Sequence, residues 1–379
     1  MPRDEDAMAS VRPATTLRNL QALRAIAALW VGVFHLNLLT GLLAEVPAAK
    51  QLAALGYAGV DVFFVISGYI MALTTARLPS NAASVGNFLF KRFARIYSGW
   101  WPFFFLYLAY DALARGLNPQ TRLLSSFFLW PTLLPHHLVP IAWTLSFELF
   151  FYMCTAAVLA WNRSRAWLAM MVWAVVVVVL NAIWFAGGLF HPDNVAAVTL
   201  PHWFFFYPLT LEFIAGFLLH ELLLRRKPGH WAPWAAGAAA IATAIAAYLR
   251  FGVFHPSGMA GLFHAPERAL LWGGFSVTLV ALVVRLEARG IRLAAWAEPL
   301  GDASYSIYLG HILVFQLLLT GRGHLPPAFS PGLEFAAMLC AAALALWLHF
   351  RFIERPLYNW SKGLFGMLLM RRTPTDAAA

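Results

Sequence analysis

The sequence has few charged residues and long stretches with none. Of its 379 residues, 12% are charged and 61% are hydrophobic, whereas a soluble domain has about 25% charged and 45–50% apolar residues. The mean hydropathy is +0.68. This composition excludes an ordinary soluble protein and indicates an integral membrane protein.

Cysteine is almost absent. Cys154 and Cys340 both lie inside apolar runs, so they provide neither a disulfide framework nor the spacing of a thiolate metal site. Six histidines of the expected outer loops lack paired ligand spacing as well: His136, His137, His191, His202, His255 and His264. We therefore expect no metal ion.

Acidic residues are outnumbered, 17 against 27 lysines and arginines, which gives a net charge of +10. A positive balance can indicate nucleic-acid binding, but here the basic residues lie between apolar segments. We expect no nucleic-acid partner. The sequence also shows no repeat of 20–50 residues and no alternating polarity of the kind found in membrane β-barrels.

Long apolar runs make up most of the chain. A membrane-spanning helix needs about 20 mostly apolar residues, and ten runs qualify, at about 20–40, 56–75, 96–114, 141–160, 166–187, 203–224, 231–249, 267–284, 303–320 and 332–353. The run 122–134 is shorter and broken by prolines, so we interpret it as re-entrant or interfacial. No clear cleavage pattern follows the first run, which we interpret as a retained span.

The basic residues indicate the orientation of these spans. Ten spans place both termini on one side, and 21 of the 27 lysines and arginines then fall on that side, which the positive-inside rule assigns to the cytoplasm. The sequence thus predicts an all-α integral membrane protein, a bundle of about ten transmembrane helices with cytoplasmic termini. We expect an N-terminal tail at 1–18, one transmembrane domain at 19–361 and a C-terminal tail at 362–379.

Three ionisable residues on three spans are expected at a similar depth. At 1.5 Å per residue, His35 and Asp61 lie roughly 8 Å and Glu148 roughly 10 Å inside the outer ends of their spans. Ionisable residues in spans face a protein interior or a wet cavity, so these three are candidate catalytic residues. Glu212 and His311 are expected deeper, near the midplane.

Arginines indicate a second site toward the cytoplasm. Arg24 lies eleven residues before His35, on the same helical face and roughly 16 Å away along the axis. Arg92 and Arg95 are three residues apart and also share a face, and arginine suits phosphate binding. Anchoring at the membrane surface explains these arginines equally well.

Six segments resemble the motifs of one family. In chain order they are LQALRAIAALWVGVFHL, GYAGVDVFFVISGYIM, FLFKRFARIYSGWWPF, AWTLSFELFFY, LGDASYSIYLGH and RFIERPL. Together they resemble acyltransferase family 3, whose members are membrane proteins that acylate bacterial glycans and related molecules. One departure is Thr144, which stands where the family's Trp-Ser-Leu-Ser-x-Glu segment has its first serine.

The resemblance implies a core of roughly ten spans and an acyl-CoA donor, most often acetyl-CoA, that arrives from the cytoplasm. It also implies that His35 is catalytic and that Arg92 and Arg95 belong to the donor site. Larger members carry an extracytoplasmic esterase-like domain, and this chain resembles the stand-alone members that modify polysaccharides or oligosaccharides. Other members act on antibiotics and small molecules, which leaves the acceptor open.

We therefore predict an O-acyltransferase of the bacterial cytoplasmic (inner) membrane, multi-pass and in contact with lipid. It would move an acyl group from acyl-CoA to a hydroxyl of an extracytoplasmic or lipid-linked glycan. In this hypothesis His35 is the general base, and Glu148, or secondarily Asp61, holds its tautomer.

The remaining candidates are donor-binding residues. Arg24 would steer acyl-CoA, and three residues of a later span would line its tunnel or stabilise the oxyanion: Tyr305, Tyr308 and His311.

Several alternatives stay open at this stage. The acyl group could pass through a covalent intermediate on His35, Ser146 or Ser67. The protein could instead be a proton-coupled exporter of a glycan or lipid precursor, with four ionisable residues as its relay: His35, Asp61, Glu148 and Glu212. It could also be a scaffold of a glycan-assembly complex, in which the polar layer is purely structural.

Overall fold

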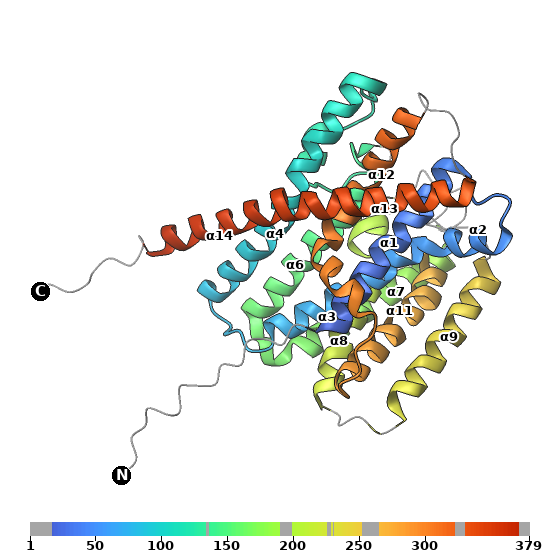
Figure 1. The fold of residues 1–379 in the computed structure, drawn as a ribbon. Coiled ribbons are helices and arrows are strands. Elements are labelled where there is room, and N and C mark those ends of the chain that lie inside the picture. Colours follow the sequence, from blue (N-terminus) through green and yellow to red (C-terminus); the bar gives the residue numbers. More distant parts are fainter. Residues whose placement is uncertain are drawn as a thin grey trace, which may run out of the picture.

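The structure is a computed structural model that describes residues 17–133, 136–189, 199–225, 229, 231–251, 265–322 and 330–370. These residues form helices and turns and contain no strand. The helices pack into a bundle, from which the C-terminal helix extends (Figure 1). The all-α prediction is confirmed for this part of the chain.

Eleven long helices build the described part: α1 (Arg18–Thr40), α3 (Gly59–Thr75), α4 (Ala82–Tyr110), α6 (Trp143–Asn162), α7 (Ala166–Ala186), α8 (Thr210–Arg225), α9 (Ala232–Phe251), α11 (Ala265–Glu287), α12 (Glu298–Arg322), α13 (Pro331–His349) and α14 (Arg355–Met370). Shorter pieces are α2 (Pro47–Ala54), α5 (Leu123–Phe127), the 3₁₀ turns η2 (Leu55–Ala58), η5 (Pro140–Ala142), η6 (Arg163–Arg165) and η9 (Ala295–Ala297), and the π turns η3 (Asp111–Arg115), η8 (Pro201–Phe205) and η10 (Phe350–Glu354). Each of the ten predicted runs falls on one of the helices from α1 to α13.

Eight helical stretches of the described residues are long and apolar enough to cross a membrane. One of them, 140–186, contains both α6 and α7, while α4 is not among the eight. The number of ten spans and the side on which the termini lie therefore stay predictions. The short run 122–134 contains the five-residue α5, and its last residue, 134, lies outside the described part.

Small residues let α3 and α8 approach closely. A Cβ added to Gly68 would lie 1.9 Å from the backbone oxygen of Phe213, and one added to Gly216 would lie 2.0 Å from that of Val65. Glycine is common at such crossings in membranes because it brings backbones within van der Waals contact. This close pair holds the middle of α3 in a fixed place.

Side-chain hydrogen bonds stabilise the first turns of two other helices. The carboxylate of Glu287 accepts hydrogen bonds from the backbone N–H groups of Arg18 and Asn19, at 2.6 and 3.0 Å, so a negative charge stabilises the first turn of α1. Asn81 caps α4 by accepting from the N–H of Ser84 at 2.9 Å. These two helices carry the arginines that the sequence singled out.

The helices α13 and α14 continue one another through the π turn η10 (red in Figure 1). Pro356 follows that turn and has no N–H to offer the carbonyl of Phe352 four residues earlier. A π turn widens the helix at such a point and is frequently found at functional sites. Here it coincides with a fully buried carboxylate, Glu354, next to the half-exposed Ile353.

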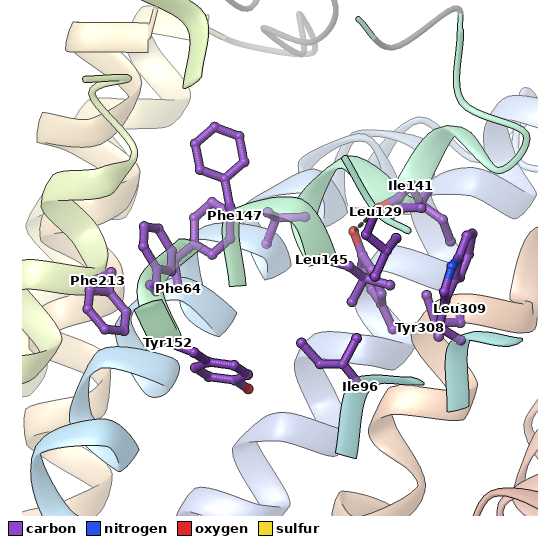
Figure 2. Close-up of a cluster of buried hydrophobic side chains, with 14 of the residues drawn as sticks. Phe64, Ile96, Leu129, Ile141, Leu145, Phe147, Tyr152, Phe213, Tyr308 and Leu309 are labelled. Atoms are coloured by element: carbon purple, nitrogen blue, oxygen red, sulfur yellow. Dashed lines mark hydrogen bonds between the residues drawn. The ribbon is translucent and has the colours of Figure 1, made fainter. Parts of the chain in front are cut away.

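Aromatic side chains form much of the core. Figure 2 shows Phe64, Phe147 and Phe213 gathered on one side of it and Tyr308 on the other. The rings of Phe151 and Phe213 stack at 4.3 Å between centroids. Rings from α3, α6 and α8 pack together in this way, and polar residues of α3 and α6, among them Ser67, Thr144 and Glu148, face a cavity that α12 also lines.

Candidate active site

Two neighbouring cavities lie among α1, α3, α4, α6 and α12. The first, which we call the inner cavity, has a volume of about 170 Å³ and is lined by Arg24, Val60, Phe63, Phe64, Ile66, Ser67, Ile70, Met71, Arg92, Arg95, Ile96, Thr144, Leu145, Glu148, Tyr152, Ser304, Tyr305 and Tyr308. The second, which we call the vestibule, has about 550 Å³ and is lined by Arg24, Thr74, Leu78, Ser84, Asn87, Phe88, Lys91, Arg92, Arg95, Asp302, Phe350, Arg355, Tyr358 and Asn359.

Three arginines border both cavities: Arg24, Arg92 and Arg95. The structure thus brings together the arginines that the sequence placed on two separate helices. Lys91 and Arg355 add positive charge to the vestibule. A pocket with this many cations is suited to phosphate groups, which guanidinium groups bind in a planar, two-pronged way.

The arginines differ in their partners. Arg92 donates to the hydroxyl of Thr74 at 2.7 Å, and Arg24 donates to the side-chain oxygen of Gln21 at 2.9 Å. Arg95 instead forms an ion pair with Glu354 at 2.7 Å.

Tyrosines and one carboxylate line the inner cavity. Glu148 accepts a short hydrogen bond from the hydroxyl of Tyr152, one helical turn later. Thr144 donates to the hydroxyl of Tyr308 at 3.0 Å, and Tyr305 donates to the backbone of α4 at 2.9 Å. Tyr152 and Tyr308 appear on opposite sides of the region in Figure 2. The cavity therefore combines hydroxyl groups and one carboxylate with largely apolar walls.

His35 lies against His311, and neither imidazole is among the residues that line the two cavities. The Nδ1 of His35 lies 3.1 Å from the Nε2 of His311, and the two rings are 4.9 Å apart. The ring of His311 is in turn 6.1 Å from that of Tyr308. From the sequence, His311 is expected deeper in the membrane than His35, whereas the structure brings the two imidazoles into direct contact.

The hydrogen bonds assign the tautomers of this pair. The Nδ1 of His311 faces the carbonyl of Ile307 at 3.1 Å and must donate to it, because a carbonyl only accepts. The Nε2 of a neutral His311 is then an acceptor, so the Nδ1–H of His35 points toward it and toward the carbonyl of Val31 at 3.0 Å. In this arrangement the basic nitrogen of His35 is Nε2.

Asp61 lies apart from His35. Its carboxylate receives two hydrogen bonds from Arg268, at 2.9 and 2.7 Å, and both side chains are buried. The contacts of Asp61 and Glu148 therefore differ from the expectation that one of these carboxylates holds the imidazole of His35. Counting residues fixes depth along a helix but not the neighbour that each side chain faces.

The sequence did not single out two charged residues that the structure buries in ion pairs. Arg268 lies at the start of one of the apolar runs, and the structure buries it against Asp61. Glu354 belongs to the segment RFIERPL, which the motif comparison noted without singling out a residue. A carboxylate directly before Arg-Pro in an apolar run was the available signal.

A comparison with known proteins now identifies the family. A family model described as an acyltransferase domain matches residues 17–351. The chain belongs to acyltransferase family 3. It is also similar to the exopolysaccharide production protein ExoZ of Rhizobium meliloti (strain 1021), with 33% identity over 317 residues, 80% of this chain and 90% of that protein. No solved structure matches.

The match to acyltransferase family 3 covers every residue that borders the inner cavity. Together with the apolar helices, it makes the protein a multi-pass membrane acyltransferase. The sequence-based assignment to this family is confirmed.

Proposed function

We propose that this acyltransferase moves an acyl group, with acetyl as the family default, from acyl-CoA to a hydroxyl of a polysaccharide or its lipid-linked precursor. Two findings support the glycan as acceptor: the family, and the similarity to a protein named for exopolysaccharide production. The observation that carries the proposal is the vestibule with its cations, which adjoins a narrow cavity next to the His35–His311 pair.

The donor fits the chemistry of the two cavities. The phosphates of acyl-CoA would be bound in the vestibule, where Arg92 and Lys91 lie. Its thin arm of amides and methylenes would enter the inner cavity, whose walls mix hydroxyl groups with apolar side chains. Since the positive-inside rule predicts the arginine side to be cytoplasmic, the donor would arrive from the cytoplasm and the acceptor from the other side.

The proposed reaction is a direct transfer with His35 as general base. The Nε2 of His35 takes the proton of the acceptor hydroxyl while the hydroxyl oxygen attacks the carbonyl carbon of the thioester. The carbon–sulfur bond breaks, and the departing CoA thiolate takes the proton from His35 to become a thiol. Base catalysis of this kind contributes about 10²–10⁴-fold to a rate. In place of a carboxylate, His311 orients the imidazole through its Nε2.

The contacts do not favour the exporter. A proton relay needs its members in hydrogen-bonding sequence. Among the described residues, Asp61 pairs with Arg268 and lies beside the buried Glu212. His35 pairs instead with His311 and Glu148 with Tyr152, so the four do not form one chain. A relay that passes a proton from one residue to the next would show a continuous chain of hydrogen bonds. We therefore propose only the acyltransferase function, and we propose that the protein resides in the bacterial inner membrane.

The first experiment measures binding of acetyl-CoA to the purified protein in detergent. Arg92→Ala should weaken binding at least tenfold, because it removes a cation that borders both cavities. The matched control is Arg322→Ala, which removes an exposed arginine paired with Glu334 and should bind like the wild type. If folded wild-type protein binds no acetyl-, propionyl- or succinyl-CoA, the proposal is wrong.

The second experiment separates binding from chemistry. His35→Ala should bind acetyl-CoA normally and yet fail to restore the acyl content of surface polysaccharide in cells that lack the wild-type gene. Normal acylation by this variant, at equal protein level in the membrane, would rule out His35 as the base.

A further inference from the structure

The two arginines of the segment KRFAR are electrostatically different. The side chain of Glu354 is fully buried, and its Oε1 accepts from Nη1 of Arg95 at 2.7 Å. Arg92 makes its hydrogen bond to a neutral hydroxyl, and among the described residues no carboxylate is paired with it. In a low-dielectric interior, a carboxylate at ion-pair distance compensates most of the guanidinium charge. Arg92 thus offers an uncompensated charge to a ligand, and Arg95 does not.

Glu354 is itself held by a chain of hydrogen bonds. Its Oε2 accepts from the hydroxyl of Ser306 at 2.5 Å, and that oxygen lies 2.9 Å from Nδ1 of His349. Since the single hydroxyl proton of Ser306 goes to the carboxylate, His349 must donate through Nδ1. The ring of His349 stacks on Phe103 at 4.2 Å. Groups from α4, α12 and α13 therefore fix this carboxylate.

The remaining contacts of Arg95 also bind it to the protein. Its Nη2 donates to the backbone oxygen of Asp302 at 3.3 Å, and its guanidinium lies over the rings of Tyr305 and Tyr358, at 5.7 and 6.0 Å. Arg95 nevertheless borders both cavities. Arg95 is thus neutralised by Glu354, held by several further contacts and placed where the two cavities meet. Such a residue is suited to determining the shape of the passage between the two cavities.

We propose that Glu354 is a positioning residue of the donor site: it fixes Arg95 between the vestibule and the inner cavity, while Arg92 supplies the charge that binds the donor's phosphates. This inference rests on the proposed acyl-CoA-dependent function. The fixed guanidinium determines where the donor's arm passes and hence how the thioester meets His35. The π turn η10, which carries Glu354, is then a functional element of the fold.

The test compares binding with turnover. Binding of acetyl-CoA is measured at several salt concentrations, and turnover is measured as release of CoA thiol with extracted surface polysaccharide as acceptor, both per folded molecule. Arg92→Ala should raise the Kd at least tenfold and reduce its salt dependence, with saturated turnover within about threefold of wild type. Glu354→Gln should leave the Kd within about threefold and lower turnover about a hundredfold, the loss expected for a misplacement near 1 Å.

A second variant covers the case in which Glu354→Gln does not fold. The double variant Arg95→Gln/Glu354→Gln removes both charges, so no buried charge stays unpaired. It should fold and keep the low turnover, because the passage still lacks its fixed guanidinium. Ser306→Ala, which removes one of the two hydrogen bonds to Glu354, should lower turnover less than Glu354→Gln. Glu267→Gln, in an exposed pair with Arg250, is the matched control and should act like wild type.

Three results would overturn the inference: wild-type turnover of Glu354→Gln or of the double variant, a rise in the Kd of Glu354→Gln equal to that of Arg92→Ala, or an equal loss of turnover in the Glu267→Gln control. These results differ from a failure of the proposed function itself. In that case the wild-type protein would bind no acyl-CoA at all.

Discussion

Replacing His311 by alanine should slow acyl transfer by a small and calculable factor. The Nε2 of His311 accepts one hydrogen bond from His35, and that bond biases His35 toward the tautomer with a basic Nε2. A neutral hydrogen bond contributes about 0.5–1.5 kcal/mol net. At about 1.4 kcal/mol per tenfold in rate, its loss lowers turnover about two- to twelvefold. The carbonyl of Val31 still accepts from Nδ1 and limits the loss.

This loss should be far smaller than that of His35→Ala. The His35→Ala variant lacks the base itself, and its rate should be lower by about 10²–10⁴-fold. Saturated turnover and acetyl-CoA affinity are measured on both variants with the thiol-release assay. The affinity of His311→Ala should be unchanged, because His311 does not line either cavity. His311→Gln should lose less than His311→Ala, since an amide oxygen can accept the same hydrogen bond.

Two outcomes would refute this reasoning about His311. If His311→Ala is as inactive as His35→Ala, His311 carries protons or contacts substrate and does more than orient its neighbour. If His311→Ala is fully active, the hydrogen bond between the two imidazoles has no role in catalysis.

The other predictions concern stability, measured by thermal unfolding in detergent. Gly216→Ala should lower the free energy of unfolding by about 1–3 kcal/mol or more, because its Cβ would lie 2.0 Å from the Val65 backbone; Gly86→Ala meets nothing within 4 Å and should not destabilise the protein. Arg268→Ala should cost about 3–5 kcal/mol by leaving Asp61 buried without its main partner, and adding Asp61→Asn should recover part of that loss. An unchanged unfolding temperature in Gly216→Ala or Arg268→Ala would contradict the packing described.

The helices were predictable because their signal is local. A run of about 20 apolar residues can bury its backbone polar groups in lipid only as a helix, and each of the ten runs falls on one. The helix α14 was missed, and the expected C-terminal tail from residue 362 is helical up to Met370. Its sequence alternates apolar and polar residues with the period of an amphipathic helix, which a search for continuous apolar runs overlooks.

The partners of the polar residues were less predictable, because they depend on tertiary contacts. Asp61 and Arg268 are 207 positions apart in the sequence, and His35 and His311 are 276 apart. The depth argument grouped His35 with Asp61 and Glu148 by level. Side chains at one level can still face different neighbours around the helix axis, so the level alone could not identify the pairs.

The ion pairs nevertheless show which buried charges the protein itself neutralises. A buried charge in a membrane protein is expensive, and several here are neutralised by an ion-pair partner on another helix, as in Asp61–Arg268 and Arg95–Glu354. Within the described residues, other charged side chains that border the cavities are hydrogen-bonded to neutral side chains and form no ion pair: Arg24, Arg92, Glu148 and Asp302.

A fold that leaves charges uncompensated beside a cavity loses stability unless a ligand supplies what is missing. Arg24 and Arg92 border the vestibule together with Lys91 and Arg355, and the phosphates of the proposed donor would supply anions for these cations. The neutralised Arg95 lies beside them and needs no such ligand. The same distribution of charge therefore supports the phosphate-bearing donor that we propose and the different roles that we assign to Arg92 and Arg95.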